Sequence, residues 1–260
     1  MNQPDTEITR NRIVIIQSLC GGDYKTGEHL FDELRYRQDI VPLFFNVASK
    51  AEFVQAIESI KGSHIDGDVL TLQLETHGCE AGIAFSNNDI MNWKEFHDLM
   101  RELNVMVGGL LGVCMAMCYG GATISTIEAN KRAPYRVIVA PFKEVPAIKV
   151  EEGFIAFYSS YRNILDLPDA IRKLQETCKD ENDKPYFSPL SAEQIFDQTF
   201  NPDRDPSHFK AMVEYHCMKL TGGLNPADLQ NIEKQIRSLM EASKISFRSY
   251  YLFHDVYKKE

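Results

Sequence analysis

The sequence predicts an α/β protein: a three-layer α/β/α sandwich built on a mostly parallel sheet of about six strands, with a C-terminal helical extension. Two observations predict this class. Short apolar runs rich in β-branched residues alternate with amphipathic helical patterns over about the first 190 residues, which is typical of a parallel sheet covered on both faces. From Ala192 onward the hydrophobic period is helical. We therefore expect a sheet domain over residues 10–200 and a helical extension over residues 201–260.

Three strands alternate with helices in the first part of the chain. Arg12–Leu19 (RIVIIQSL) predicts a buried strand, and the pattern GEHLFDELRYR from Gly27 predicts an amphipathic helix. A second strand begins at Val41, and Ser49 is a suitable N-cap for the helix after it. The third strand, Asp68–His77, alternates leucine with polar residues and ends on a histidine.

The middle of the chain continues this alternation. Gly78–Ile90 predicts a small hairpin with Asn87–Asn88 at its tip, and Asn92 is then placed to cap a helix. Leu110–Cys118 (LLGVCMAMC) is apolar on both faces, as a central parallel strand should be, and it ends on a cysteine. The other expected elements are a helix after Gly121, a strand over 136–142, a helix over 150–163 continued over 168–178, a loop over 179–189 with a short edge strand at 186–190, and C-terminal helices broken at NPDRDP and TGGLNP.

The charge pattern excludes some classes of partner. Lys and Arg number 28 against 37 Asp and Glu, for a formal net charge of −9, and the basic residues form no stripe, so we expect no nucleic-acid partner. No run approaches the roughly 18 apolar residues that a membrane helix needs, and the first ten residues lack the apolar core of a signal peptide. Six cysteines without disulfide-framework spacing suit a reducing compartment. These features predict a soluble, unexported, cytoplasmic chain with no membrane partner.

Two residues at expected strand ends are candidates for catalysis. Ligands of parallel sheets bind beyond the carboxyl ends of the strands, and His77 and Cys118 both occupy that edge. A thiol attacks a carbonyl when an imidazole takes its proton and N–H groups stabilise the oxyanion. We expect Cys118 to be the nucleophile, His77 the general acid and base, and the N–H groups of Gly78 and Cys118 the oxyanion hole, with the positive end of the next helix lowering the thiol pKa. Asp23 and Lys25, which follow the first strand, are candidates for a substrate pocket.

The motifs around these residues resemble the caspase family. His77–Gly78 followed by Glu80–Ile83 is similar to the caspase block in which a strand ends in His-Gly before a Glu-x-Gly-Ile hairpin. Ala116–Gly120 (AMCYG) is similar to the Gln-Ala-Cys-x-Gly signature, and closer to the Ala-Cys-Tyr-Gly form of bacterial caspase-like and CHAT-type peptidases. Thr26–Leu30 (TGEHL) and Ile90–Glu95 (IMNWKE) resemble two further blocks of that bacterial subgroup.

The resemblance covers about residues 10–200 and implies a function. It implies a caspase-like sandwich, cysteine endopeptidase activity without a cofactor, and a His-Cys dyad with no obligatory third member. It also implies a protein or peptide substrate, and a regulated bacterial effector in anti-phage defence or cell death, with an activating or inhibitory protein partner. Ala116 stands where caspases have glutamine, two residues before the nucleophile, so cleavage after aspartate is not implied.

Three alternatives remain open at this stage. Cys114, four residues before Cys118, is a second candidate nucleophile. His77, Cys79, Cys114 and Cys118 are possible zinc ligands, but residues four apart on a strand lie about 13 Å apart, too far for the last two to share one ion, so we expect no metal. A non-catalytic binding or adaptor module with the same fold would take a partner in the same cleft.

Overall fold

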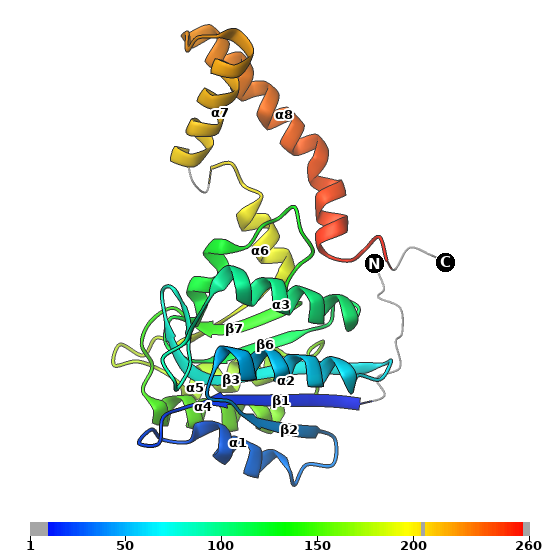
Figure 1. The fold of residues 1–260 in the computed structure, drawn as a ribbon, viewed down its shortest axis with the longest axis vertical. Helices are drawn as coiled ribbons and strands as arrows, with labels where there is room; N and C mark the ends of the chain where they lie inside the picture. Colours follow the sequence, from blue (N-terminus) through cyan, green and yellow to red (C-terminus); the bar gives the residue numbers. More distant parts are fainter. Residues whose placement is uncertain (1–9, 204–205, 257–260) are drawn as a thin grey trace. The chain divides into compact units, whose positions relative to one another are not determined.

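The sheet has the strand order β2-β1-β3-β6-β7-β8 in the computed structural model, which describes residues 10–203 and 206–256 (Figure 1). Five neighbouring strands pair in parallel: β1 (Arg10–Ser18), β2 (Val41–Asn46), β3 (Asp68–Cys79), β6 (Gly112–Ala116) and β7 (Val137–Pro141). The short β8 (Phe187–Ser191) pairs antiparallel with β7 at the edge, and β4 (Gly82–Ala84) and β5 (Ile90–Asn92) form an antiparallel extension of β3. The predicted α/β class and mostly parallel sheet are confirmed.

Helices cover both faces of this sheet. On one face, α4 (Ala147–Ser160) packs against both α1 (Thr26–Leu34) and α5 (Pro168–Thr177). Their apolar side chains form one buried cluster with residues of β1, β6 and β7, such as Ile13, Cys114 and Val139. On the other face, α2 (Lys50–Gly62) and α3 (Trp93–Met106) lie side by side in front of the sheet (Figure 1). This arrangement is consistent with the expected three layers.

Helix starts follow the capping residues found in the sequence. The Ser49 side chain accepts a hydrogen bond from the Glu52 N–H at the start of α2. At the start of α3, the Asn92 side chain accepts from the Glu95 N–H while the Glu95 carboxylate accepts from the Asn92 N–H, which completes a capping box. Both predicted N-caps are therefore confirmed. They could be predicted because each capping bond joins residues three apart in the sequence.

The ends of two strands differ from the prediction. β3 continues past His77 to Cys79, because its last three residues pair with β4. β6 stops at Ala116, so Cys118 lies in the turn beyond the strand rather than at its last position. The helix expected after Gly121 is a short 3-10 helix, η1 (Gly120–Thr126), preceded by Tyr119 in the left-handed region at φ 56°.

The described residues divide into two compact units. The first contains the sheet: the residues up to Ile127 together with Ala133–Ala192. The second contains Glu128–Arg132 and the residues from Glu193 onward. Its helices are α6 (Ala192–Thr199), α7 (Pro206–Thr221) and α8 (Pro226–Tyr251).

The second unit has its own small core. Phe209, Val213 and Cys217 of α7 pack with Ile232 of α8 in one buried cluster. The short segment Glu128–Arg132 joins this unit through Arg132, whose guanidinium donates to Asp255 Oδ2 at 2.7 Å. This packing gives the C-terminal helices an apolar centre separate from the core of the sheet.

The expectation that the chain has no membrane-spanning helix and the expectation that it is not exported depend on different residues. Within residues 10–203 and 206–256, no helix combines the length and the apolar character needed to cross a membrane. Residues 1–9, on which the expectation of an unexported chain depends, lie outside the described residues.

Candidate active site

The strand order places a binding position at the carboxyl ends of β1, β3 and β6. The chain passes from β1 to β2 on one side and then crosses back to β3, on the other side of β1, from which the sheet continues to β6. Ligands of open α/β sheets bind at such a reversal of direction. A pocket of about 240 Å³ lies there. Its lining residues are Leu19, Asp23, Tyr24, Thr26, Thr76, His77, Ala116, Met117, Cys118, Val145, Ala147 and Val150. The pocket therefore brings together His77 and Cys118, although 41 residues separate them in the sequence.

Asp23 holds the His77 ring. His77 Nε2 and Asp23 Oδ2 are 2.9 Å apart, and the same Asp23 oxygen accepts the Cys20 N–H at 2.6 Å, which fixes the carboxylate in the loop after β1. The hydrogen bond to His77 lowers the pKa of Asp23, so this carboxylate is ionised at neutral pH. The His77 side chain remains 57% exposed, and its Nδ1 atom makes no hydrogen bond to any described residue. Nδ1 is thus the ring nitrogen available for proton transfer.

Gly78 brings the end of β3 against the turn that carries Cys118. A Cβ atom at Gly78 would lie 2.2 Å from the Cys118 carbonyl oxygen and 3.0 Å from Met117 Cγ, so only glycine fits this approach. The side chain of Met117 is buried, and its sulfur accepts from the Thr76 hydroxyl at 3.6 Å. These contacts fix the turn on the strand that bears His77.

The Cys118 and Tyr119 N–H groups differ in their hydrogen bonding. Tyr119, in the left-handed region, directs its N–H to the Lys143 carbonyl at 3.3 Å. Among the described residues, the Cys118 N–H has no hydrogen-bond acceptor. An unpaired amide beside a partly exposed cysteine is available to donate to an oxyanion.

The other candidates from the sequence have different surroundings. Lys25 Nζ donates to the carbonyls of Leu19 and Cys20 at 2.9 and 2.5 Å, so this residue braces the loop after β1. Cys114 lies inside β6, is 1% exposed, and burial raises its pKa to about 12, which disfavours a thiolate there. Among the described residues, His, Cys, Asp and Glu side chains form no group of three or more that could hold a metal ion.

Sequence reasoning missed a buried carboxyl beneath the pocket. Glu75 is 1% exposed; its Oε2 accepts from the Thr26 hydroxyl at 2.6 Å, and its Oε1 accepts from the Gln73 amide at 2.7 Å. Gln73 in turn accepts from the Tyr158 hydroxyl of α4 at 2.9 Å. Burial raises the pKa of Glu75 to about 7. The signal in the sequence is the alternation LTLQLE. Its polar residues Thr71, Gln73 and Glu75 bond to Tyr161, Tyr158 and Thr26 rather than facing water.

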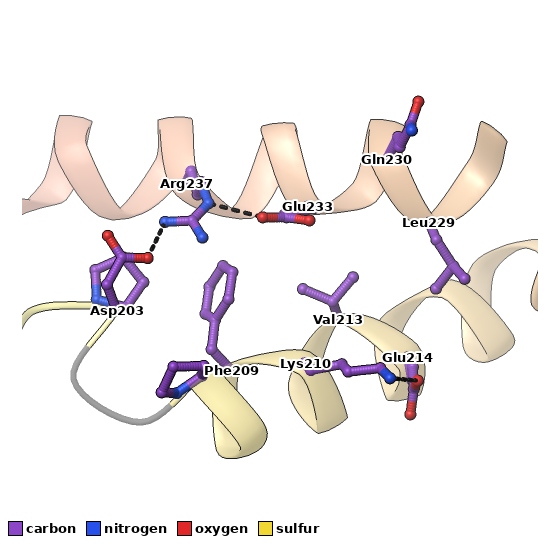
Figure 2. A pocket seen from close by; sticks show the side chains of 11 residues that line it. Asp203, Phe209, Lys210, Val213, Glu214, Leu229, Gln230, Glu233 and Arg237 are labelled. Atoms are coloured by element: carbon purple, nitrogen blue, oxygen red, sulfur yellow. Dashed lines mark hydrogen bonds and ion pairs between the residues drawn. The ribbon is translucent and has the colours of Figure 1, made fainter. Parts of the chain in front are cut away.

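A second pocket lies within the helical unit, between α7 and α8 (Figure 2). Its centre is apolar, with Phe209, Val213 and Leu229, and the Arg237 guanidinium lies 4.5 Å from the centre of the Phe209 ring. Arg237 also forms ion pairs with Asp203 and Glu233 at 3.0 and 2.9 Å (Figure 2). The lining residues include no cysteine or histidine, so this pocket offers no nucleophile and imidazole pair.

Comparison of the sequence with models of known protein families and with curated proteins gives no match.

Proposed function

We propose that this protein is a cysteine endopeptidase of the caspase-like type, with Cys118 as the nucleophile and His77 as the general acid and base. The observation that supports this most strongly is the pocket at the carboxyl edge of the sheet, which is lined by both residues and by the Asp23 carboxylate that holds His77. The resemblance of the His-Gly and Cys-Tyr-Gly motifs to bacterial caspase-like peptidases supports it independently. The substrate class is a protein or peptide.

The first chemical step uses the free nitrogen of His77. The Cys118 thiol gives its proton to His77 Nδ1, and the thiolate attacks the carbonyl carbon of the scissile peptide bond. The oxyanion that forms accepts hydrogen bonds from the Cys118 N–H and, as we propose, from the Gly78 N–H. The imidazolium then returns the proton to the leaving amine, which departs and leaves a thioester on Cys118.

Hydrolysis of the thioester repeats these roles with water. His77 removes a proton from water, the hydroxide attacks the thioester carbonyl, and the collapsing intermediate releases the carboxylic acid and the Cys118 thiolate, which recovers its proton from His77. Asp23 contributes by accepting the Nε2–H bond, which keeps Nδ1 free and stabilises the imidazolium in both steps. The expected dyad is thus extended to three residues, with Asp23 as a positioning residue rather than as part of a substrate pocket alone.

Covalent labelling tests this proposal without a known substrate. A mixture of peptidyl acyloxymethyl ketones, which react with activated thiols, is incubated with wild-type protein, Cys118→Ala and His77→Ala, and adducts are measured by intact mass. We expect one adduct on Cys118 in the wild type, no adduct in Cys118→Ala, and much slower labelling in His77→Ala.

A matched control distinguishes activation from exposure. Cys20 is an exposed cysteine, so Cys20→Ala should label like the wild type. Equal labelling of Cys20 and Cys118, or labelling at Cys114, would show that Cys118 is not activated. A folded wild type that takes up no label would instead support the binding-module alternative.

A further inference from the structure

Helix α1, which begins directly after the loop that carries Asp23, has no cap of its own. Its N-cap residue, Lys25, makes no side-chain hydrogen bond to the start of the helix. The Gly27 and Glu28 N–H groups donate instead to Gln17 Oε1 at 3.1 and 3.2 Å, and Gln17 is the last residue but one of β1. A strand residue therefore accepts the N–H groups that a Ser, Asp or Asn N-cap ordinarily binds.

Glu75 completes this arrangement from the neighbouring strand. It is the register partner of Gln17 in the parallel pair of β1 and β3, and its Oε2 accepts from the Thr26 hydroxyl at 2.6 Å. A Cβ atom at Gly27 would lie 2.9 Å from Gln17 Oε1 and 3.0 Å from Glu75 Cγ, so glycine lets the helix start come close to both strands. All three polar side chains are buried, with at most 5% exposure. We call Gln17 and Glu75 the strand cap of α1.

The loop between β1 and α1 depends on its two ends. This loop, residues 19–25, places Asp23 against His77. At Gly21 and Gly22 a Cβ atom would meet nothing within 4 Å, and glycine has the greatest backbone freedom of any residue. The position of Asp23 therefore depends on the end of β1 on one side and on the strand cap at the start of α1 on the other.

A carboxyl group in the strand cap needs a reason beyond packing. Glu75 is 1% exposed and loses its hydration there, whereas an apolar side chain would fill the same space without that cost. An apolar side chain would, however, bond neither to the Thr26 hydroxyl nor to the Gln73 amide, both of which Glu75 holds. What Glu75 supplies is thus a fixed position for the start of α1.

We propose that Gln17 and Glu75 are positioning residues for the general base: they fix the start of α1, and with it the loop whose Asp23 holds His77. The inference rests on the proposed function, because the orientation of the His77 ring matters for proton exchange with Cys118. When the strand cap is broken, the loop moves, Asp23 leaves the ring, and proton transfer slows. The loss is limited to what removal of Asp23 itself costs, about 10- to 100-fold in rate.

Thr26→Val tests the strand cap with little change of shape, since it removes the hydroxyl that Glu75 binds and keeps a branched side chain. Labelling of Cys118 by the peptidyl ketone mixture is timed, and urea unfolding is measured on the same preparations. We expect labelling to be about 5- to 10-fold slower than in the wild type. Thr71→Val is the matched control: its buried hydroxyl lies 2.5 Å from that of Tyr161, and it pairs with the first residue of β6, away from the carboxyl edge. Its labelling rate should not change, whatever its stability.

Further variants show whether the effect passes through Asp23. In Asp23→Asn the hold on His77 is already weakened, so adding Thr26→Val should slow labelling by less than about twofold. Glu75→Gln keeps a partner for both the Thr26 hydroxyl and the Gln73 amide, and it should label within about threefold of the wild type. Glu75→Leu keeps neither partner and should label as slowly as Thr26→Val.

Several results would overturn the inference. These are equal slowing in Thr26→Val and Thr71→Val, the full effect of Thr26→Val in the Asp23→Asn background, or wild-type labelling in Thr26→Val or in a folded Glu75→Leu. Wild-type labelling would show that other contacts, such as the bond from the Tyr24 hydroxyl to Glu151, hold the loop without the strand cap. Any of these leaves the peptidase proposal intact, whereas a folded wild type whose Cys118 takes up no label overturns both.

Discussion

Replacing Gly78 with alanine should separate the two halves of the candidate active site. Gly78 is on the strand that carries His77, and its Cα lies against the carbonyl of Cys118. A Cβ atom built there is 2.2 Å from that oxygen, whereas Cβ atoms in proteins essentially never come closer than 3.0 Å to a neighbouring atom. The strand and the turn must therefore move apart by at least 0.8 Å.

Both the stability and the activity of Gly78→Ala follow from this displacement. Overpacking of a well-packed region costs about 1–3 kcal/mol of unfolding free energy. A shift of about 1 Å between catalytic groups costs about 100-fold in rate, because proton transfer and attack need close alignment. We expect kcat/KM of Gly78→Ala on a cleaved peptide to fall about 100-fold, with KM changed less than kcat.

Urea unfolding and steady-state kinetics on the same preparations check both values. The control is Gly62→Ala at the end of α2, where a Cβ would meet nothing within 4 Å, and we expect wild-type activity from it. A Gly78→Ala protein with kcat/KM within threefold of the wild type and an unchanged urea midpoint would refute the reasoning, because the turn would then not be held against β3.

Three further changes have defined outcomes. Asp23→Asn should lower kcat about 10- to 100-fold with little change in KM, because the ring orientation of His77 is lost; steady-state kinetics test this, and a kcat within twofold would contradict it. Burial raises the pKa of Glu75 from 4.5 to about 7, so between these pH values the folded state binds more protons than the unfolded state. The free energy of unfolding that Glu75 contributes therefore falls as pH rises through this range, by on the order of 3 kcal/mol. Urea unfolding at pH 5 and pH 7 should show a smaller loss in Glu75→Gln than in the wild type, and equal losses would contradict this. Asn92→Ala should cost about 1 kcal/mol in urea unfolding through loss of the α3 cap, and an unchanged midpoint would show that the capping box contributes nothing.

The elements that sequence reasoning predicted well depend on local signals. β1 and the hydrophobic face of α3 follow from periodicity, and the helix starts at Ser49 and Asn92 follow from side chains that bond within four residues. The edge position of β8 follows from Pro189, which lacks the N–H that a central strand would need.

The positions that sequence reasoning misplaced depend on distant partners. β3 extends past His77 only because β4 pairs with it, and β6 ends before Cys118 because the chain turns through the left-handed Tyr119. Both catalytic candidates still line the same pocket, since neighbouring parallel strands end at the same edge of the sheet.

The contacts that organise the candidate site were not predictable from the sequence. The bond between Asp23 and His77 joins residues 54 apart, and no pattern in the sequence marks it. Glu75 looks like a solvent-facing position in an alternating strand, but it is buried and bonds to Thr26 of α1 and to Gln73. Gln73 is in turn bonded to Tyr158, more than 80 residues later on α4. Sequence periodicity reports which residues alternate, whereas burial depends on what the rest of the chain places on each face.

The measurement that tests the central claim most directly is a survey of cleavage sites. Purified wild type and Cys118→Ala are incubated with a complex peptide mixture, and new N-termini are identified by mass spectrometry. We expect cuts in the wild type that are absent from Cys118→Ala. The same cuts in both samples would contradict the assignment of Cys118 as the nucleophile.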